Sequence, residues 1–499
     1  MTATPQQAQV DAAPGEGAAA WLAGLTPLLM IGNEWVPAQS GMTFRTVNPA
    51  TEQLLAEVAA GDTADVDAAV RAARTAFDDG PWTRLSPADR SRMLRDLAAL
   101  VEANAEQLAE LDTLDNGMTL ATARSLVARA VGYLYHYSGA ASFITGETMT
   151  TPPGSFQYSL REPIGVCAGI IPWNGPTLLA CQKIGPALAA GNTLILKPAE
   201  QTPLSALRLA ELVLDAGFPP GVINVVTGLG ETAGAALTAH PGVDKVVFTG
   251  SPEVGKKIIA SSADTVKRLT LELGGKSPNI IFPDADLDAA IPAAFRGFSM
   301  LSGQICIAAT RLFVQREAKD EVVERLAGYA AAARVGDPFD PATTLGPLVS
   351  REQVDRVAGY VETGKSEGAV ARTGGKPLPG PGYFVTPTVF DAVRNSMRIA
   401  QEEIFGPVVS VIPFTDADDA VLQGNDTSYG LAAAVWTRDI STAHAVARRL
   451  RAGTVWVNTY GTTLPAMPFG GYKESGLGND RGPHWYEQYT QQKAVYVQL

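Results

Sequence analysis

From residue 164 onward, short apolar runs alternate with helical segments, and this alternation constrains the fold more than any other feature of the chain. The runs at 164–171, 193–197, 222–226 and 245–250 are apolar nearly throughout, which is typical of strands buried on both faces. Helices are expected after each run, the last capped by Ser251. Repeated strand–helix–strand units predict a doubly wound parallel sheet, which binds ligands beyond the carboxyl ends of its strands.

The segments on either side complete the predicted α/β architecture. After a short strand-rich start, apolar residues recur at helical spacing over 66–77. A second helix is expected to begin at the capping residue Ser86 and to end by Gly117. A second α/β unit is expected over about 275–471.

Two further strand-like segments have no obvious partner in either unit. Residues 156–161 alternate apolar and polar side chains, as in one strand of an antiparallel pair, and the terminal segment 494–499 is also strand-like. A terminal strand needs an edge with which to pair. We expect the two segments to pair across a subunit interface as a small antiparallel oligomerisation flap.

The composition limits the classes of partner. Lys and Arg number 39 against 51 Asp and Glu, a net charge of −12, which argues against nucleic acid or an anionic membrane as the main partner. No apolar run reaches membrane-spanning length. The first 20 residues are rich in Ala, Gly, Pro and Gln and lack Lys and Arg, which is wrong for a secretory signal and predicts a flexible extension. With three cysteines, too few for a disulfide framework, we expect a reduced cytoplasmic protein.

The three cysteines differ in context. Cys167 lies inside an apolar run and Cys181 on a helix among leucines, so both are expected to be inert core thiols. Cys306 follows Ser302-Gly303-Gln304-Ile305, where the glycine suits a tight turn that presents backbone N–H groups. Taken alone, this context still favours a buried structural thiol.

The histidines and one glutamate are the candidates for a metal site and for a general base. The four histidines are scattered and have no ligand spacing, so no metal site is expected. Glu272 is flanked by leucines and followed by two glycines, and apolar surroundings would raise the pKa of its carboxyl group and suit a general base. The local sequence alone favours a solvated ion pair of this carboxylate with Lys276.

The phosphate-binding signal is weak by spacing alone. The spacing of Gly228, Gly230 and Gly234 differs from the G-x-G-x-x-G pattern by one residue. An ordinary strand-to-helix turn is an equally good interpretation of this segment. The turn before Ser251 is a second candidate, because a capped helix N-terminus offers free N–H groups to an anion.

Seven motifs in order resemble those of the aldehyde dehydrogenase superfamily, NAD(P)-dependent enzymes with a cysteine nucleophile. The resemblance extends from about Gly32 to the C-terminus and implies a Rossmann-like cofactor domain with a second α/β catalytic domain. The motifs are Ile171-Pro172-Trp173-Asn174, Lys197-Pro198-Ala199-Glu200, Phe248-Thr249-Gly250-Ser251, Leu271-Glu272-Leu273-Gly274-Gly275-Lys276-Ser277-Pro278, Gly303-Gln304-Ile305-Cys306, Glu402-Glu403-Ile404-Phe405-Gly406-Pro407 and Pro468-Phe469-Gly470-Gly471-Tyr472-Lys473-Glu474-Ser475-Gly476.

The resemblance implies three catalytic residues. Cys306 would attack the aldehyde carbon as a thiolate, and the Asn174 amide and the Cys306 backbone N–H would hold the oxyanion. Glu272 would activate the water that releases the carboxylic acid from the thioester.

The resemblance also implies a nucleotide site. Lys197 and Glu200 would contact the adenine-side ribose, Ser251 the pyrophosphate, and Glu403 and Phe405 the nicotinamide end. The Glu200 carboxylate would repel a 2′-phosphate, so NAD is expected over NADP, although Lys197 could rescue NADP. The full set of expected cofactor contacts is Ile171, Pro172, Trp173, Lys197, Glu200, Gly230, Phe248, Gly250, Ser251, Val254, Leu273, Glu403 and Phe405.

The substrate pocket is read by the same resemblance. Neither 297–310 nor 459–469 contains Arg or Lys, so an anionic semialdehyde lacks an obvious partner and an apolar or aromatic aldehyde is expected. The expected lining residues are Gly175, Leu178, Leu179, Gln182, Leu301, Ile305, Ile307, Thr463, Leu464, Met467 and Phe469.

Two positions depart from the family pattern. Leu301 stands where the family commonly has Asn, and Asn479-Asp480 stands where Arg-Glu is frequent. Because Asp is one methylene shorter than Glu, a proton-relay role for Asp480 is in doubt.

The expected domain organisation follows. Residues 1–21 form a flexible extension, 22–139 and 162–274 the NAD-binding domain, 275–474 the catalytic domain, and 140–161 with 483–499 the oligomerisation segments. The expected partners are a small-molecule aldehyde and a second copy of the chain, as a homodimer or homotetramer, with no nucleic acid and no membrane.

Three alternative functions remain at this point. A CoA-acylating aldehyde dehydrogenase would need no water-activating base, so the presence of Glu272 disfavours this alternative. A Cys-dependent esterase would cleave esters without any redox step. A non-catalytic binding protein is disfavoured by the intact Cys306, Glu272 and Asn174.

Overall fold

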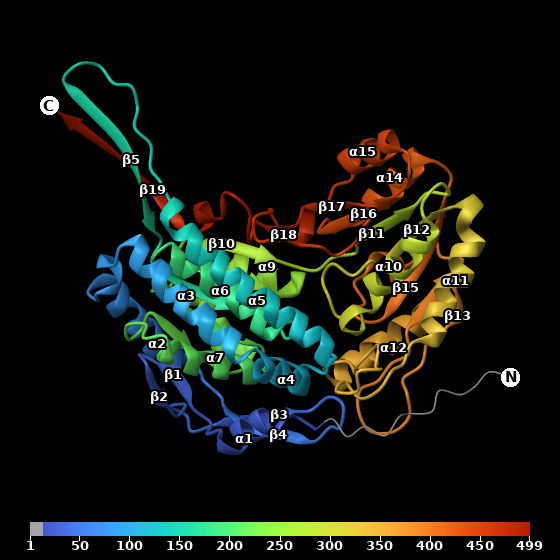
Figure 1. Ribbon diagram of the computed structural model, residues 1–499, viewed down its shortest axis with the longest axis horizontal. Helices are drawn as coiled ribbons and strands as arrows, with labels where there is room; N and C mark the ends of the chain where they lie inside the picture. The colour runs from blue at the N-terminus through green and yellow to red at the C-terminus, as the bar shows by residue number, and fades with distance from the viewer. Residues whose placement is uncertain (1–12) are drawn as a thin grey trace.

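The computed structural model describes residues 13–499, and these form two lobes, each built around its own sheet (Figure 1). The first sheet has eight strands. Their order across the sheet is β18 (Gly476–Leu477), β10 (Arg268–Glu272), β9 (Lys245–Thr249), β6 (Val166–Ile170), β7 (Thr193–Lys197), β8 (Ile223–Val225), β1 (Leu29–Ile31) and β2 (Glu34–Val36).

The first sheet is doubly wound, as the alternating pattern predicts. Strands β10, β9, β6, β7 and β8 are all parallel. The chain runs from β6 through β7 to β8 on one side and then returns to β9 on the other side of β6. The order therefore reverses between β6 and β9, and the crevice beyond the carboxyl ends of these two strands is where such sheets bind ligands.

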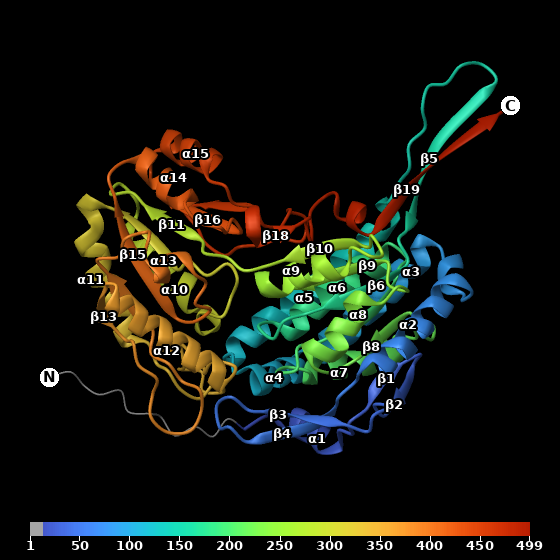
Figure 2. The ribbon, with the colours of Figure 1, turned by 180° about the vertical axis from the view of Figure 1, so that it is seen from behind.

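Helices cover both faces of this sheet (Figure 2). Side chains of β6 alternate, with Cys167 in the hydrophobic cluster on one face and Val166 and Ala168 in the cluster on the other. The helices of this lobe are α2 (Thr63–Asp78), α3 (Pro87–Ala103), α4 (Ala105–Asn116), α5 (Leu120–Ala140), α6 (Pro176–Ala189), α7 (Leu204–Asp215), α8 (Ala235–Ala239) and α9 (Pro252–Ser261).

The helix expected from Ser86 to Gly117 is two helices. Ser86 caps α3 in a capping box, and Gly117 ends α4 in the left-handed conformation, as expected. Between them Asn104 leaves helical geometry, with φ −107° and ψ 17°, and its side-chain amide donates to the Leu100 carbonyl oxygen. Asparagine competes with the helix for backbone partners, which accounts for the break.

The second sheet forms the α/β unit expected over about 275–471. Its order is β13 (Val370–Thr373), β14 (Thr388–Asp391), β15 (Val408–Phe414), β12 (Arg311–Gln315), β11 (Pro278–Ile281), β16 (Ala432–Trp436) and β17 (Thr454–Val457), with only β13 antiparallel. Its helices are α10 (Leu287–Ser299), α11 (Lys319–Ala332), α12 (Arg351–Ser366), α13 (Arg398–Gln401), α14 (Ala417–Asn425) and α15 (Ile440–Arg449).

The link between β10 and β11 determines how the two sheets face each other. Strand β10 ends at Glu272 and β11 begins at Pro278, so residues 273–277 alone connect these two strands. The carboxyl edge of the first sheet is therefore close to the amino edge of the second, where β12 and β16 also begin.

The prediction that the two strand-like segments pair with each other across a subunit interface is wrong, because they pair within one chain. Strands β5 (Ser155–Pro163) and β19 (Thr490–Gln498) pair antiparallel with each other in the same chain, in continuous register from Thr490 with Pro163 to Gln498 with Ser155. They form a two-stranded ribbon that projects from the first lobe (Figures 1 and 2). Because β5 and β19 satisfy each other's backbone N–H and C=O groups within one chain, neither strand needs a second subunit as its partner.

The prediction of a flexible extension over residues 1–21 is wrong from Glu16 onward. Residues 1–12 lie outside the described part, but α1 (Glu16–Gly24) is helical, with Ala18 buried beside Leu111 and the Trp21 indole N–H donating to Glu211. These tertiary contacts order a segment whose composition alone predicted flexibility. Strands β3 (Thr43–Val47) and β4 (Leu54–Ala59) form a separate hairpin. Within residues 13–499, no helix is long and apolar enough to cross a membrane.

Candidate active site

The register of the first sheet aligns the residues that were expected to bind a nucleotide. Ile170 is paired with Lys197 on one side and with Phe248 on the other, and Phe248 is paired with Leu271. The segments that follow these strands therefore leave the sheet along one edge. Glu272, one position beyond Leu271, is paired with Thr249.

The loop after β6 is tied to both neighbouring elements. Its Ile171 N–H donates to the Lys197 carbonyl oxygen at 3.1 Å, and the Asn116 amide donates to the Trp173 carbonyl oxygen at 2.8 Å. The Asn174 amide then reaches across to the second lobe, donating to the Gln304 carbonyl oxygen at 2.9 Å. This bond places the amide beside the segment that carries Cys306.

The turn before Cys306 is as tight as its glycine suggests. Leu301 and Ser302 both have φ of 53°, and Gly303 has φ of 75°. A Cβ at Gly303 would lie 2.1 Å from the Gly406 carbonyl oxygen, so no side chain fits there. Three successive left-handed residues are unfavourable locally and persist only when their surroundings hold them.

Cys306 is the one cysteine of the three that is partly exposed, while Cys167 and Cys181 are buried as expected. Burial raises the pKa of the Cys306 thiol to about 12, and the nearby Glu403 and Glu272 carboxyl groups add to this effect. The thiol is therefore protonated at neutral pH, and forming the thiolate requires a base.

Glu272, which influences the pKa of the Cys306 thiol, is a buried carboxyl group without a partner. Its side chain is 4% exposed and neither carboxyl oxygen has a hydrogen-bond partner. Burial, with a contribution from Asp480, raises its pKa well above the ordinary value. The alternative of a solvated ion pair with Lys276 is wrong, because the Lys276 ammonium group is also buried without a partner.

Asp480 lies in the same electrostatic environment. Its carboxylate forms a buried ion pair with Lys183 at 2.9 Å, and its second oxygen has no partner. Both Asp480 and Lys183 influence the pKa of Glu272. The shorter side chain at position 480 therefore still lies close enough to interact with the base.

Glu403 is held against the link between the two sheets. Its carboxylate accepts the Gly275 backbone N–H at 2.9 Å, and a Cβ at Gly274 would lie 2.2 Å from the carboxylate. Burial raises the pKa of Glu403 to about 7. The Phe405 ring lies edge-on to the Trp173 ring at 5.2 Å, so residues from both lobes meet here.

The rest of the edge is shaped to accept a dinucleotide. Ser251 caps α9 by accepting the Val254 N–H, which leaves further N–H groups at this helix end for an anion. Nothing lies within 4 Å of a Cβ placed on Gly230, and Gly234 packs on the Lys197 side chain. The Lys197 ammonium group is 3.5 Å from Glu200, a geometry suited to ribose hydroxyls. The glycine-rich segment that was a candidate phosphate-binding loop forms a π-helical turn over Gly230–Gly234.

The expected pocket residues are only partly brought together. Ile305, Cys306, Ile307 and Phe469 pack in one hydrophobic cluster with Leu431, which joins the cysteine turn to the loop before Phe469. In contrast, Met467 is 60% exposed and Leu464 57% exposed. Leu178, Gln182 and Leu301 are buried, while Leu179 and Thr463 are partly exposed.

Two arginines at this loop were missed by the sequence analysis. The Arg129 guanidinium, on α5, donates to the Thr463 hydroxyl at 2.6 Å. Arg481 lies over the Phe469 ring at 4.3 Å and donates to the Tyr133 hydroxyl. The separation of 334 residues between Arg129 and Thr463 gives no sequence signal that could have revealed the contact.

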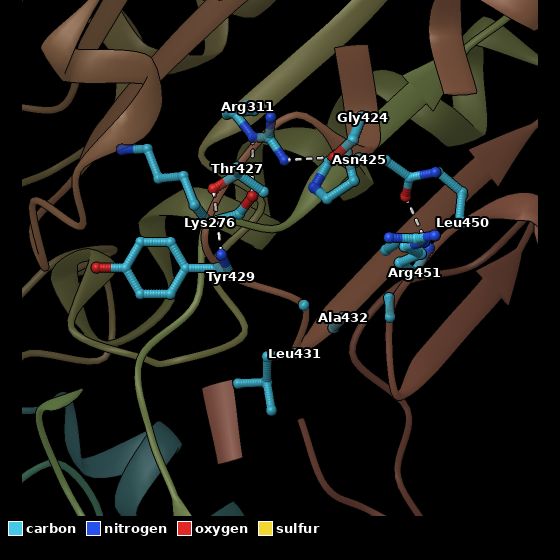
Figure 3. A pocket seen from close by; sticks show the side chains of 14 residues that line it. Lys276, Arg311, Gly424, Asn425, Thr427, Tyr429, Leu431, Ala432, Leu450 and Arg451 are labelled. Carbon is cyan, nitrogen blue, oxygen red and sulfur yellow. Dashed lines mark hydrogen bonds between the residues drawn. The ribbon is translucent and has the colours of Figure 1, made fainter. Parts of the chain in front are cut away.

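A separate pocket is lined by Lys276, Arg311 and Tyr429, and also by Leu431 of the cluster described above (Figure 3). It contains none of the expected site residues. Arg311 crosses it, donating to the carbonyl oxygens of Lys276 and Gly424 at 2.9 and 2.7 Å. Arg311 therefore braces the end of the link between the two sheets.

Within residues 13–499, no group of three His, Cys, Asp or Glu side chains is placed to hold a metal ion.

Comparison with known proteins gives consistent matches over nearly the whole chain. The family profile described as "Aldehyde dehydrogenase family" matches residues 35–495. The putative aldehyde dehydrogenase DhaS of Bacillus subtilis is 50% identical over 95% of this chain and 96% of its own length. A mitochondrial aldehyde dehydrogenase of Homo sapiens is 47% identical over 94% of this chain and 92% of its own.

Solved structures match equally well. An NAD+ complex of an aldehyde dehydrogenase from Bacillus cereus has a TM-score of 0.96 and 46% identity, covering 98% of this chain and 99% of that one. An indole-3-acetaldehyde dehydrogenase of P. syringae, in complex with NAD+ and IAA, has a TM-score of 0.94 and 43% identity, covering 97% and 99%.

Proposed function

The chain belongs to the aldehyde dehydrogenase family, and on that premise we propose how its own residues oxidise an aldehyde to the free carboxylic acid. It is an NAD-dependent aldehyde dehydrogenase. The observation that carries the proposed mechanism is the bond from the Asn174 amide to the Gln304 carbonyl oxygen, two residues before Cys306.

The first step is attack by Cys306 on the aldehyde carbon. Because the pKa of the thiol is raised, the proton must leave as the C–S bond forms, and the unpaired Glu272 carboxyl group is the available acceptor in its ionised form. The Asn174 nitrogen carries two hydrogens and gives one to Gln304, so the other is free for the developing oxyanion. The Cys306 backbone N–H is the second donor.

When bound, NAD would supply the hydride acceptor for oxidation of the Cys306 adduct to the thioester. Residues of both lobes would hold its two ends. Lys197, Glu200 and Ser251 would contact the adenine side from the first lobe, and Glu403 and Phe405 would contact the nicotinamide side from the second.

Hydrolysis of the thioester completes the reaction. Glu272 first releases the thiol proton to solvent and then takes a proton from water, and the resulting hydroxide adds to the acyl carbon. Cys306 leaves as the thiolate and recovers a proton from Glu272. A buried carboxyl group with a raised pKa suits this role. The same base argues for a free acid as product rather than a CoA thioester.

The body of the aldehyde is proposed to be apolar or aromatic. Ile305, Ile307 and Phe469 are apolar side chains in the same hydrophobic cluster as Cys306. An aromatic substrate is also named for the indole-3-acetaldehyde dehydrogenase of P. syringae. A short succinate-type semialdehyde turned over more efficiently than benzaldehyde would contradict this part of the proposal.

The enzyme is further proposed to act as a homo-oligomer through its projecting ribbon. Among residues 13–499, β19 pairs only with β5, which leaves its other edge free, and Phe156, Tyr496 and Leu499 on the ribbon are exposed. Removing residues 494–499 is expected to reduce the molar mass measured by light scattering to that of a monomer. An unchanged mass would contradict the proposed interface.

NADH formation over an aldehyde panel, with NAD and NADP and with the wild type and Cys306→Ala, tests the proposed function. We expect turnover in the wild type with NAD and none in the variant. Ester cleavage by a wild type that forms no NADH with any aldehyde would favour the esterase alternative. NADH formation that requires CoA would favour the acylating alternative.

A further inference from the structure

Two guanidinium groups converge on the wall of the proposed substrate pocket. Arg129 donates to Thr463 at 2.6 Å, and Arg481 donates to the Tyr133 hydroxyl, with which Arg129 also interacts. The two cations thus share one phenol oxygen, although they come from α5 and from the segment after β18.

These cations lack the partner that buried arginines normally have. Within residues 13–499, neither Arg129 nor Arg481 forms an ion pair with a carboxylate. Arg481 is 6% exposed, and its Nε is buried without any hydrogen-bond partner. Burying like charges side by side without an anion is costly, so their arrangement calls for a negatively charged ligand.

The position of the pair relative to Cys306 points to a substrate rather than to an unrelated anion. Phe469 packs in the hydrophobic cluster of Cys306, and Arg481 lies over the Phe469 ring at 4.3 Å. Arg481 also acts electrostatically on both Cys306 and Glu272. The Phe469 ring therefore connects the Arg481 guanidinium group to the hydrophobic cluster that contains the thiol.

We propose that Arg129 and Arg481 bind an anionic group, such as a carboxylate, at the far end of an aldehyde whose apolar or aromatic body lies beside Cys306. This inference rests on the proposed function and names the substrate class more closely. Arg129 has free donors and is only half-buried, so it can present a planar pair of N–H groups to the anion. Arg481, anchored on Tyr133 and Phe469, supplies fixed positive charge behind it.

The sequence around Cys306 and Phe469 could not reveal a cationic partner for an anionic aldehyde. The segments 297–310 and 459–469 contain no Arg or Lys, but α5 brings Arg129 to Thr463 from elsewhere in the chain. The apolar lining and the cationic end are compatible, because they face different parts of one substrate.

The test compares 4-carboxybenzaldehyde with 4-methylbenzaldehyde, which has a similar size and no charge. In the wild type, we expect the carboxylated aldehyde to have the higher kcat/KM. In Arg129→Met, we expect the ratio of the two kcat/KM values to fall at least tenfold, mainly through KM, with an intermediate value in Arg129→Lys. Arg124→Met is the matched control, because Arg124 lies on the same helix but is exposed and paired with Glu106. A ratio unchanged in Arg129→Met would overturn the inference while leaving the proposed function intact.

A binding measurement keeps the inference testable without turnover. In Cys306→Ala, calorimetry with 4-carboxybenzaldehyde and with 4-methylbenzaldehyde is expected to show tighter binding of 4-carboxybenzaldehyde. Adding Arg129→Met to that protein should weaken 4-carboxybenzaldehyde binding about tenfold and leave 4-methylbenzaldehyde binding unchanged. Equal binding of both aldehydes, or no binding of 4-carboxybenzaldehyde, would overturn the inference whether or not the wild type oxidises aldehydes.

Discussion

The side-chain amide of Asn174 donates a 2.9 Å hydrogen bond to the carbonyl oxygen of Gln304, and this bond joins the two lobes beside Cys306. Asn174 follows a strand of the first sheet, whereas Gln304 precedes a strand of the second. The bond fixes an N–H donor of one lobe next to the nucleophile of the other. Because electrostatic stabilisation depends on donors that are oriented in advance, this contact is central to the proposed chemistry.

Replacing Asn174 with the isosteric Asp removes both the tether and the free donor. The expected result is a fall in kcat of about 10²–10³-fold, the range seen when one oxyanion donor is lost. Steady-state kinetics with benzaldehyde measure it. NAD affinity, measured by fluorescence titration, should change less than about twofold, because Asn174 is not among the proposed nucleotide contacts. A kcat loss below tenfold would contradict the role of Asn174.

Glu272→Gln removes the proposed proton acceptor from both the attack of Cys306 and the hydrolysis. An amide cannot take a proton from the thiol or from water, so we expect steady-state turnover to fall about 10²–10⁴-fold, with a thioester that forms slowly and then persists on Cys306. Mass spectrometry of the quenched variant should detect the acyl adduct. Cys306→Ala serves as the control and should show no adduct. A variant that hydrolyses the thioester at the wild-type rate would exclude Glu272 as the base.

The reactivity of Cys306 in the free enzyme should depend steeply on pH. Since its surroundings raise the pKa of the thiol to about 12, the thiolate fraction grows about tenfold per pH unit between pH 7 and 9. The rate of iodoacetamide alkylation should rise in proportion, as followed by mass spectrometry of the labelled protein. Cys306→Ser corrects for reaction at Cys167 and Cys181, which are buried. A plateau below pH 8 would show that the thiol titrates much lower.

Glu200→Gln should relax the preference for NAD. The variant removes the repulsion between the carboxylate and a 2′-phosphate, worth roughly 1–4 kcal/mol, and leaves Lys197 beside the ribose. We expect the ratio of kcat/KM for NADP to that for NAD to rise about tenfold. Glu34→Gln, on the edge strand β2, provides a control with the same change of charge. An unchanged ratio would mean that residues other than Glu200 determine the preference for NAD over NADP.

Two buried carboxyl groups on α4 should make stability depend on pH. Burial raises the pKa of Asp112 to about 7 and that of Asp115 well above its ordinary value. Between pH 4 and 7 the folded protein keeps a proton on Asp112 that the unfolded chain loses, so the free energy of unfolding falls as pH rises, by up to roughly 4 kcal/mol.

Asp112→Asn removes this titration. Urea unfolding at pH 5 and pH 7.5, followed by circular dichroism, should show a smaller loss of stability across this range in Asp112→Asn than in the wild type. Asp96→Asn, on the exposed face of α3, is the control. Equal losses in the wild type and Asp112→Asn would mean that Asp112 is already ionised at pH 5.

The order of strands and helices could be read from the sequence because local patterns encode it. Uniformly apolar runs predicted β6, β7 and β9, and the Ser-Pro signals predicted the starts of α3 and α9. The tight turn before Cys306 was likewise expected from Gly303. By contrast, the helical α1 was missed, because Ala18 and Trp21 are ordered by contacts with residues far along the chain.

The sequence by itself therefore determined the parallel α/β architecture, the resemblance to the family and the candidates Cys306, Glu272 and Asn174. Only the tertiary structure decided that Glu272 is unpaired rather than bonded to Lys276, that β5 and β19 pair within one chain, and that Arg129 lies against Thr463. Secondary structure depends on neighbours a few residues apart, whereas burial and charge depend on contacts between distant segments. The electrostatic environment of the site is therefore a property of the folded chain.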